Sequence, residues 1–514
     1  MLKKSFISGA LILMFSGLIV RLMGFIYRIY LSNLIGAEGM GLFQLIFPLY
    51  GLVILTLTSG ISISVSRMVA EEVGINNPAN KRKIMICGMQ LVVGVSIIAS
   101  LLCFAYADFI SISILKDWRT YFSLILLIPC IPVIAAASAL KGYFYGMQEM
   151  IPTAVSQIVE QIVRIGLVML TASWFLNLGL EYACAIATFG TALGEIANLL
   201  VLLLIYLLKK RKQSKDMKNE SLPGNLKIYK ELIFSAFPIS FNRFIISIMG
   251  VVETLLIPAR LVFGGMSHKL SLEAFGRMTG MAMPLIFFPT VITSALATAL
   301  VPSISESAAR NNYKGVRNKI SRTIQMTIVQ GIIFTIIFSC YSNQICDVIY
   351  RNGKVGASLY LLSFTCVFIY LQQILGGVLN GLGMQTTLLW NSLIGGVLRI
   401  GFVYFYIPLY GIESYVWCIM ISAGMVCILN MYAITTKIDL IVDIKNWFVK
   451  PGIVGVLMAV SSRYIYSFFS IFLSKDIWII SFTLLANFII AMELMLLVGV
   501  IEKNELAKLL GFKK

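Results

Sequence analysis

Apolar stretches long enough to cross a membrane recur along the whole chain, separated by short polar segments. A helix of about 20 apolar residues spans the hydrocarbon core of a bilayer. We predict fourteen such helices, at residues 5–31, 41–66, 83–106, 120–140, 152–176, 182–208, 231–257, 275–301, 319–341, 356–380, 386–408, 413–436, 450–470 and 477–501. The pattern therefore predicts an all-α polytopic membrane protein with 14 transmembrane helices.

The composition agrees with a membrane protein and limits its chemistry. Hydrophobic residues make up 59% of the chain and charged residues 12%, about half the charge of a soluble domain. Lys3 and Lys4 followed by an apolar run imitate a signal peptide, but no small-residue cleavage site follows, so we expect a retained first helix. One histidine and nine scattered cysteines without a CxxC pair predict no metal site and no cofactor.

Positive charges are divided unevenly between the two sets of loops. With the N-terminus inside, the cytoplasmic segments hold 27 of the 41 lysines and arginines, and the outer loops hold seven. Because cytoplasmic loops are enriched in these residues, we expect both termini in the cytoplasm and a multi-pass protein of the cytoplasmic (cell) membrane. The net charge of +18 lies largely in loops, so it indicates contact with membrane lipids and no nucleic-acid partner.

A sequence repeat relates the two halves of the chain. The matches are Thr58-Ser59 with Thr293-Ser294, Gly146-Met147-Gln148 with Gly383-Met384-Gln385, and Arg164-Ile165-Gly166 with Arg399-Ile400-Gly401, at offsets of 235 to 237. Six helices per repeat is an even number, so both repeats insert the same way up. The repeat therefore predicts two six-helix lobes in a parallel pseudo-twofold arrangement, with two extra C-terminal helices.

The repeat and the charge pattern together divide the chain into four parts. We expect an N-terminal six-helix lobe at 1–208, a basic cytoplasmic linker at 209–230, a C-terminal six-helix lobe at 231–437, and helices 13 and 14 with a cytoplasmic tail at 438–514. The linker carries eight basic residues and is interpreted as a solvated segment near the anionic inner leaflet, with a regulatory site as the alternative. One chain supplies both lobes, so a monomer is sufficient.

Seven arginines remain within or at the edge of the predicted helices, and five of them are the candidate binding residues: Arg21, Arg28, Arg164, Arg243 and Arg399. A charge at that depth is costly and usually faces a partner or a water-filled cavity. Guanidinium groups bind phosphate oxygens through a planar fork. Two like lobes that rock on each other expose a central cleft to each side in turn. We therefore predict a transporter whose arginines bind a lipid-linked anionic saccharide substrate.

Structural alternatives remain open for several of these cations. Glu160 and Arg164 are four residues apart, so they can pair on one face of their helix. Arg28 and Arg277 lie nearer the outer surface, where a long side chain can snorkel to water. Arg21 and Arg243, its counterpart in the seventh predicted helix, lie too deep to reach water easily. This depth favours a functional role for both.

The remaining charges inside helices are harder to interpret. Glu253 is a possible coupling residue for a proton or cation, and a structural role is equally compatible with its position. Glu195 and Glu493 are typical of interhelical hydrogen-bond partners. Arg463 lies outside the repeat, and the pattern assigns it no role.

Prolines and glycines inside the predicted helices are candidate points of bending and close approach. Pro48 in the second helix and Pro284 and Pro289 in the eighth are the candidate hinges, because proline removes a backbone hydrogen bond. Small residues let helix backbones approach closely. The candidates for close approach are Gly24, Gly60, Gly376 and Gly377.

Two segments resemble a known family. Arg21-x-x-Gly24-Phe25-x-x-Arg28, followed by Ile35-Gly36-Ala37-Glu38-Gly39-x-Gly41-Leu42, resembles the opening of the stage V sporulation protein B family. This family belongs to the polysaccharide-transport branch of the multidrug/oligosaccharidyl-lipid/polysaccharide exporter superfamily. The segment Ala297-Thr298-Ala299-Leu300-Val301-Pro302-Ser303-Ile304-Ser305-Glu306 is similar to the end of helix eight in the same group.

The resemblance implies a flippase for undecaprenyl-diphosphate-linked saccharides, of the lipid II flippase kind, that works by alternating access. It implies that arginines of the first helix, Arg21 among them, bind the diphosphate and sugar in a central cavity. It also implies that helices 13 and 14 form a groove for the lipid tail. The sporulation branch is implied to support spore cortex peptidoglycan synthesis, with cell-wall synthesis enzymes as possible partners.

Three other functions compete with a flippase. A cation-coupled multidrug exporter of the same superfamily commonly needs an acid in its first helix, and none occurs between Lys4 and Glu38. A non-transporting scaffold of a cell-wall complex leaves the intramembrane arginines unexplained. A membrane glycosyl- or phosphotransferase needs metal-binding carboxylates, and the chain lacks a DxD or HExxH motif to support one. We therefore expect no catalytic residues and no enzyme.

Overall fold

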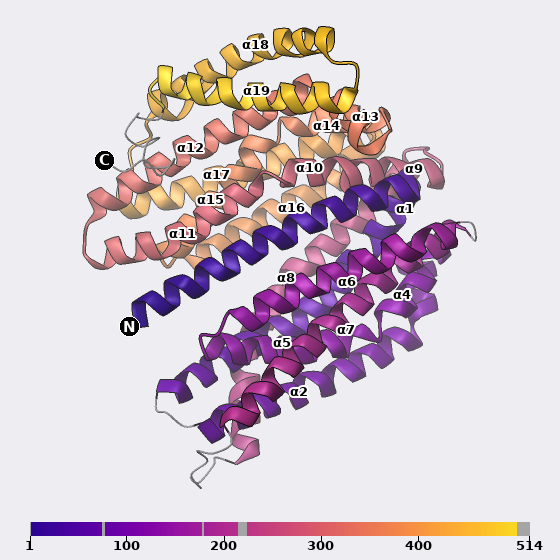
Figure 1. The fold of residues 1–514 in the computed structure, drawn as a ribbon, viewed down its shortest axis with the longest axis vertical. Helices are drawn as coiled ribbons and strands as arrows, with labels where there is room; N and C mark the ends of the chain where they lie inside the picture. The colour runs from indigo at the N-terminus through magenta and orange to yellow at the C-terminus, as the bar shows by residue number, and fades with distance from the viewer. Residues whose placement is uncertain (1, 75–77, 177–178, 214–223, 501–514) are drawn as a thin grey trace. The chain divides into compact units, whose positions relative to one another are not determined.

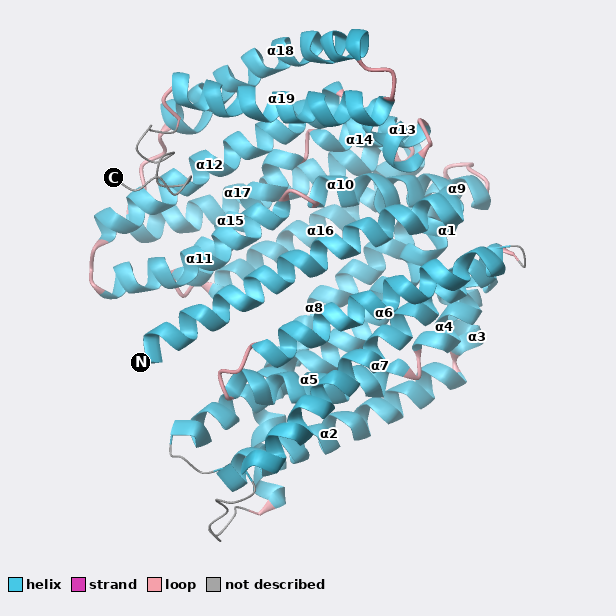
Figure 2. Ribbon diagram, in the orientation of Figure 1, coloured by secondary structure: helices cyan, strands magenta, loops and turns pink. Residues whose placement is uncertain are grey.

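Helices make up the secondary structure of the described chain, which comprises residues 2–74, 78–176, 179–213 and 224–500 of a computed structural model (Figures 1 and 2). No strand occurs in these residues. The chain forms two compact units, residues 1–258 and 259–514.

The first unit contains α1 (Leu2–Gly74), α2 (Pro78–Ala105), α3 (Ala107–Phe109), η1 (Ile110–Ile114), η2 (Trp118–Thr120), α4 (Tyr121–Leu127), α5 (Cys130–Gly146), α6 (Ile151–Leu176), α7 (Leu180–Gln213) and most of α8 (Asn225–Phe263). The second unit contains α9 (His268–Phe275), η3 (Gly276–Ala282), α10 (Met283–Phe287), α11 (Thr290–Ala309), α12 (Tyr313–Cys340), α13 (Ser342–Tyr350), α14 (Lys354–Ser363), α15 (Cys366–Gly381), α16 (Gln385–Tyr410), α17 (Glu413–Ile438), η4 (Lys445–Val449), α18 (Lys450–Phe472) and α19 (Asp476–Leu497).

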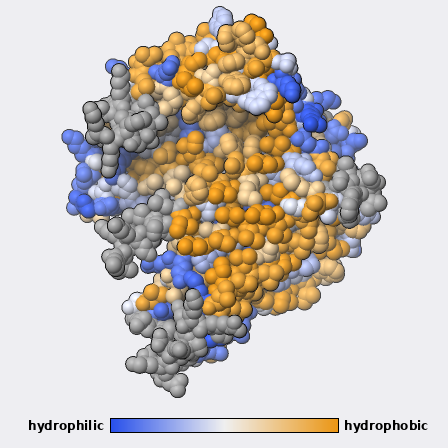
Figure 3. Space-filling view, viewed as in Figure 1, coloured by the Kyte–Doolittle hydropathy of each residue, from blue (hydrophilic) through white to orange (hydrophobic). Residues whose placement is uncertain are grey.

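The prediction of fourteen membrane spans agrees with the helices of the described residues. Eleven helices are long and apolar enough to cross a membrane, and two bent pairs raise the number to 13. The first of the eleven joins two predicted spans, because α1 continues through a break at Gly36. Counting its two arms separately gives fourteen. Figure 3 shows apolar residues along the sides of the helices and hydrophilic residues towards their ends, as a multi-pass membrane protein requires.

The break in α1 falls at a glycine, between the predicted spans 5–31 and 41–66. Gly36 has φ 67° and ψ −171°, a conformation that is open to glycine because it lacks a Cβ. Pro48 lies twelve residues further on, inside the second arm of the helix. The backbone of α1 therefore changes direction between the first and second predicted spans.

The predicted eighth helix, 275–301, is not continuous. A π-helical turn, η3, leads into α10, and a second break separates α10 from α11. Pro284 lies in the first turn of α10 and Pro289 caps α11, positions where the missing N–H breaks no helical hydrogen bond. The two candidate hinge prolines of this segment thus lie beside its breaks.

The bends in two other spans occur at matching places in the repeat. The α4–α5 pair is bent by 42° and the α14–α15 pair by 52°. The second segment of the first pair ends at Gly146 and that of the second pair at Gly381, an offset of 235. The repeat seen in the sequence is therefore also a repeat of helix geometry.

Glycines hold equivalent helices together in the two units. A Cβ at Gly142 of α5 would lie 2.5 Å from the carbonyl oxygen of Ser62 on α1. A Cβ at Gly377 of α15 would lie 3.0 Å from the Cα of Ala297 on α11. Both partners are also related by the offset of 235, so the same helix contact is built twice.

The other glycines proposed for close approach give a mixed result. A Cβ at Gly60 would meet the carbonyl oxygen of Ala236 on α8, so close approach is confirmed there. A Cβ at Gly376 would make only ordinary contacts with Leu388, and a Cβ at Gly24 would meet nothing within 4 Å. Glycine at the last two positions is therefore not needed for helix packing within the chain.

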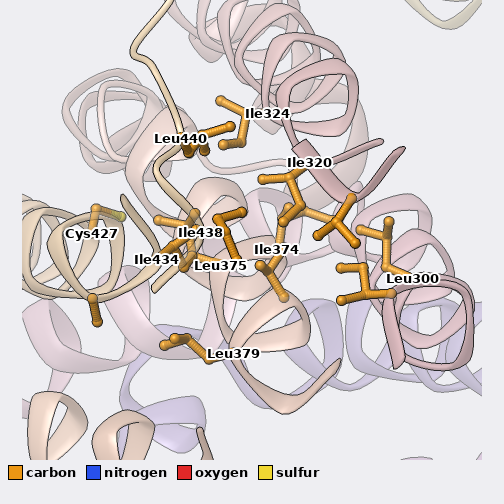
Figure 4. Packing of buried hydrophobic residues seen from close by; sticks show 14 of the residues in the cluster. Leu300, Ile320, Ile324, Ile374, Leu375, Leu379, Cys427, Ile434, Ile438 and Leu440 are labelled. Atoms are coloured by element: carbon orange, nitrogen blue, oxygen red, sulfur yellow. The ribbon is translucent and has the colours of Figure 1, made fainter. Parts of the chain in front are cut away.

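Each unit has its own apolar core. In the first unit, the first turns of α8 pack through Ile228, Leu232 and Ala236 on residues of α1 and α2. In the second unit, Ile320 and Ile324 of α12 pack on residues of α11, α15 and α17, among them Leu300, Ile374 and Ile434 (Figure 4).

The packing of α8 explains why the contacts divide the chain at Pro258, whereas the sequence repeat places its boundary in the segment 209–230. The lobe boundaries derived from the repeat stay a prediction. Residues 214–223 of the proposed linker and 501–514 of the proposed tail lie outside the described residues.

The repeated glycine contact predicts that a Gly→Ala substitution changes the free energy of unfolding differently at two pairs of positions. Gly142→Ala and Gly377→Ala should each lower the free energy of unfolding by about 1–3 kcal/mol, because the new Cβ overlaps the facing backbone. Gly166→Ala and Gly401→Ala, also related by the offset of 235, should be neutral or stabilising by up to about 1 kcal/mol, because the new Cβ meets nothing within 4 Å. Thermal unfolding in detergent, followed through the reactivity of buried cysteines, measures this. Equal effects at all four positions would contradict the contact.

Candidate functional site

The five candidate arginines are distributed over four helices. Arg21 and Arg28 lie on the first arm of α1, Arg164 on α6 and Arg243 on α8, all in the first unit; Arg399 lies on α16 of the second unit. Seven residues, about two helical turns, separate the two arginines of α1, so they share a face. The first of them is exposed and the second is half-buried.

Arg164 forms the ion pair within its helix that its spacing allows. Its Nη2 donates a hydrogen bond to Oε1 of Glu160 at 2.7 Å, and both side chains are largely buried between α6 and α7. The same Nη2 lies 3.9 Å from Oε1 of Glu195 on α7. This guanidinium is therefore already engaged by two carboxylates of its own unit.

Asn198 completes the polar cluster between α6 and α7. Its Nδ2 donates to Oε2 of Glu160 at 3.0 Å and to Oε2 of Glu195 at 3.4 Å. Asn198 has no exposed surface, so its amide binds the two carboxylates from the interior of the helix pair. The sequence analysis interpreted Glu195 as an interhelical hydrogen-bond partner, and the contacts of this side chain with α6 and Asn198 agree with that interpretation. Asn198 was missed, although it lies three residues after Glu195 on one face of the helix.

The second unit has no charged cluster at the equivalent positions. An offset of 235 relates Glu160 to Gly395 and Glu195 to Asn430. There, the Nδ2 of Asn391 donates to the Oδ1 of Asn430 at 2.8 Å, which joins α16 to α17 through neutral side chains. The helix pair is repeated, and Arg399 on α16 matches Arg164, but the two carboxylates have no counterpart in the second unit.

Arg243 is in a different situation from Arg164. It is exposed on α8 and forms no side-chain hydrogen bond or ion pair with the described residues. Glu253, the candidate coupling residue, lies ten residues further along α8, about 15 Å away along the axis, and is buried with 8% of its surface exposed. The two side chains therefore lie at different depths of one helix.

Two further arginines are held by acids near helix ends. Arg277 in η3 pairs with Glu273 of α9, with 3.4 Å between Nη1 and Oε2. Arg119, which the sequence interpretation counted only as a loop charge, lies 2.7 Å from Oε1 of Glu38 and 2.8 Å from Oδ2 of Asp117. This cluster fixes η2 to α1 two residues after the break at Gly36. Its long sequence separation leaves no local signal by which sequence reasoning could find it.

The chemistry available to these residues is binding of anions. No group of three or more His, Cys, Asp or Glu side chains that could hold a metal ion occurs in the part of the chain that is described. Guanidinium groups bind phosphate or carboxylate through paired N–H donors. Of the candidates, Arg164 is neutralised by Glu160, whereas Arg243 presents its charge without an acidic partner.

Two known proteins resemble the chain over most of its length. Stage V sporulation protein B of Bacillus subtilis is 28% identical over 99% of this chain and 98% of its own. The lipid II flippase MurJ of the same organism is 26% identical over 78% of this chain and 77% of its own.

Solved structures show the same fold. A structure of the lipid II flippase MurJ in an inward closed conformation matches 97% of this chain and 99% of its own, with a TM-score of 0.70 and 14% identity. An inward-facing multidrug resistance MATE family transporter of the MOP superfamily matches 82% and 98%, with a TM-score of 0.64 and 14% identity. The chain therefore has the fold of these two proteins.

The match to a family extends over more than half of the sequence. Residues 6–308 match the family described as polysaccharide biosynthesis protein, a stretch that covers the first unit from residue 6 onwards and the start of the second. This stretch contains Arg21, Arg28, Arg164 and Arg243. The resemblance predicted from the opening motif is confirmed, and the chain belongs to the polysaccharide biosynthesis protein family.

Proposed function

We propose that the protein is a flippase that moves undecaprenyl-diphosphate-linked saccharides across the cytoplasmic membrane by alternating access. The observation that carries this proposal is the exposed guanidinium of Arg243, inside a membrane-spanning helix and without an ion pair in the described chain. A charge in that position is costly unless it serves a ligand or a hydrated space. A diphosphate headgroup supplies the missing negative charge.

The two arginines of α1 support the same substrate. Arg21 and Arg28 lie on one face of a helix that has no acidic residue before Glu38. Two guanidinium groups on one face suit two phosphates better than one lysine would, because each forms a planar fork of donors. Arg164 is a weaker candidate because its carboxylate partners already bind it, and Arg399 lies at the equivalent position of the second unit.

The relatives support a peptidoglycan precursor as the saccharide. One relative is named a lipid II flippase and another a stage V sporulation protein. We infer a lipid II-like substrate and a role in spore cortex synthesis, with cell-wall synthesis enzymes as partners. Membrane lipids are the immediate surroundings, a single chain supplies both lobes, and both termini are proposed to face the cytoplasm.

The conformational cycle is proposed to use the breaks in the helices. Pro284 and Pro289 lie beside the two breaks of the segment 276–309, where little helical hydrogen bonding resists bending. Pro48, inside α1, is proposed as a further hinge. Glu253 is proposed as the coupling residue, because a buried carboxylate within a membrane helix is suited to carry a proton or bind a cation.

A multidrug exporter is the second candidate, because the fold is also that of a MATE family transporter. The charges argue against it. Cationic drugs need a negative binding region, whereas the first helix of this chain carries arginines and no acid before Glu38. A scaffold without transport activity leaves the exposed charge of Arg243 without a function.

The flippase proposal predicts that two arginines are needed for headgroup transfer. In liposomes with a fluorescent undecaprenyl-diphosphate saccharide, Arg21→Ala and Arg243→Ala should each slow exposure of the headgroup on the far leaflet by tenfold or more. The reason is the loss of a charge-assisted fork to phosphate, about 1.5–3 kcal/mol per hydrogen bond. Arg310→Ala is the control, because this side chain is 72% exposed in a surface ion pair with Glu306.

Two outcomes would count against the flippase. Equal rates for the wild type, both variants and empty liposomes, in protein shown to be folded, would exclude lipid flipping under these conditions. Arginine-dependent efflux of a cationic dye instead of the lipid would favour the multidrug exporter.

The cluster between α6 and α7 predicts a structural role for Arg164. Arg164→Gln should lower the free energy of unfolding by about 3–5 kcal/mol, because it leaves Glu160 and Glu195 buried without a cation. The double variant Glu160→Gln/Arg164→Gln should recover much of that loss, since one of the two carboxylates is then neutral. Thermal unfolding measures both. Slower flipping by Arg164→Gln with unchanged stability would instead assign this arginine to the substrate.

A further inference from the structure

Helix α18 has a buried face that fixes its orientation. Figure 1 shows α18 beside α19 at the edge of the second unit, and it packs on α12, α19 and η4. Val454, Met458 and Ser462 on this face have no exposed surface. The hydroxyl of Ser462 donates to Oδ1 of Asn487 on α19 at 2.6 Å, and Nδ2 of Asn487 donates to the hydroxyl of Tyr341 at 3.0 Å. A buried polar network therefore prevents the helix from turning about its axis.

The opposite face of α18 carries an exposed seam with the spacing of a helix-packing interface. Its members follow one another at alternating intervals of three and four residues, which keeps them on one side of a helix and is the a/d spacing of a heptad. They are Ile453, Val456, Val460, Arg463, Ser467 and Ser470, and all are exposed. Val456 has 66% and Val460 56% of its surface exposed, so no part of the described chain covers the seam.

Arg463 places a positive charge in the middle of this seam. It lies thirteen residues after the start of α18 and nine before its end, so about 20 Å and about 14 Å of helix separate it from the two ends. Two and a half turns to the nearer end is too far for the usual escape of an arginine near a helix terminus. The side chain forms no ion pair or hydrogen bond with the described residues.

The serines of the seam present small surfaces rather than free donors. The hydroxyl of Ser467 donates to the carbonyl oxygen of Arg463 at 3.2 Å, and that of Ser470 donates to the carbonyl oxygen of Ser467 at 2.8 Å. Donors satisfied within their own helix add little to the binding of an anion. Small side chains at these intervals do allow another helix to approach closely.

We infer that this seam is a docking surface for one transmembrane helix of another protein, with an acidic residue facing Arg463. The β-branched and serine positions give the partner helix a packing surface, and the arginine requires a negative charge at the same depth. The phosphates of bilayer lipids lie outside the hydrocarbon core, more than two turns from Arg463, so a lipid headgroup is a poorer fit. The inference is independent of the proposed flippase function, because no candidate substrate residue belongs to the seam.

The experiment uses the full chain in phosphatidylcholine liposomes and a donor-labelled transmembrane peptide. The peptide has Ala and Val at its heptad a and d positions and one Glu at its midpoint; matched peptides carry Gln or Leu there. Energy transfer to acceptor-labelled protein measures association. We expect the Glu peptide to bind at least tenfold more tightly than the Leu peptide.

Variants of α18 locate the binding on the seam. Arg463→Leu and Val460→Trp should each weaken binding of the Glu peptide by tenfold or more, whereas Arg463→Lys should retain part of it. Tyr464→Leu is the matched control, because Tyr464 is 74% exposed on the same helix but lies off the seam. Thermal unfolding of each variant verifies that the fold is intact.

Three outcomes would overturn the inference. The first is equal binding of the Glu and Leu peptides, or equal binding by the wild type and Arg463→Leu. The second is Arg463-dependent energy transfer between differently labelled copies of the protein, which would make a second copy the occupant. The third is Arg463-dependent enrichment of labelled phosphatidylglycerol at the protein, which would make an anionic lipid the occupant.

Discussion

A guanidinium inside a bilayer has no water to solvate it, and this constraint governs the arrangement of charge throughout the protein. The arginines meet it in two ways. Arg164 lies between helices of one unit and is bound by Glu160, with Glu195 nearby, and Arg277 pairs with Glu273. Arg243 lies at an exposed position without an ion pair in the described residues. Arg164 and Arg277 each have a glutamate four residues earlier in the chain, whereas the residues four before and four after Arg243 are Ile239 and Ser247.

The two units share a backbone plan and differ in charge. The contact of Gly142 with Ser62 recurs as that of Gly377 with Ala297, and the bent spans end at equivalent residues. Close helix contacts leave no space for a Cβ, so these positions cannot vary without moving a helix. The polar positions are not limited in this way, and Glu160 and Glu195 are replaced in the second unit by Gly395 and Asn430. The repeat therefore conserves packing while leaving each unit its own electrostatics.

The sequence could predict features that recur along the chain, either as apolar stretches of membrane length or as matches between the two halves. Apolar length predicted the spans, and the offset of 235 predicted the paired helices, because both are local or repeated signals. The break in α1 lies at Gly36, inside the gap between the predicted spans 5–31 and 41–66, whereas Pro48 lies inside the second arm. A glycine adopts the positive φ of this break because it lacks a Cβ.

Contacts between distant residues had no such signal. The four-residue spacing of Glu160 and Arg164 predicted their pairing, but nothing local connects Asn198 to the first of them or Arg119 to Glu38. Those contacts depend on which helices become neighbours. The seam on α18 could be predicted only in part. Its heptad spacing is visible in the sequence, but only the burial of Ser462 and Met458 shows which face of the helix is left uncovered. That face carries the positive charge of Arg463, which no ion pair in the described chain neutralises. The two helices outside the repeat therefore need a negative charge that the repeated lobes do not supply.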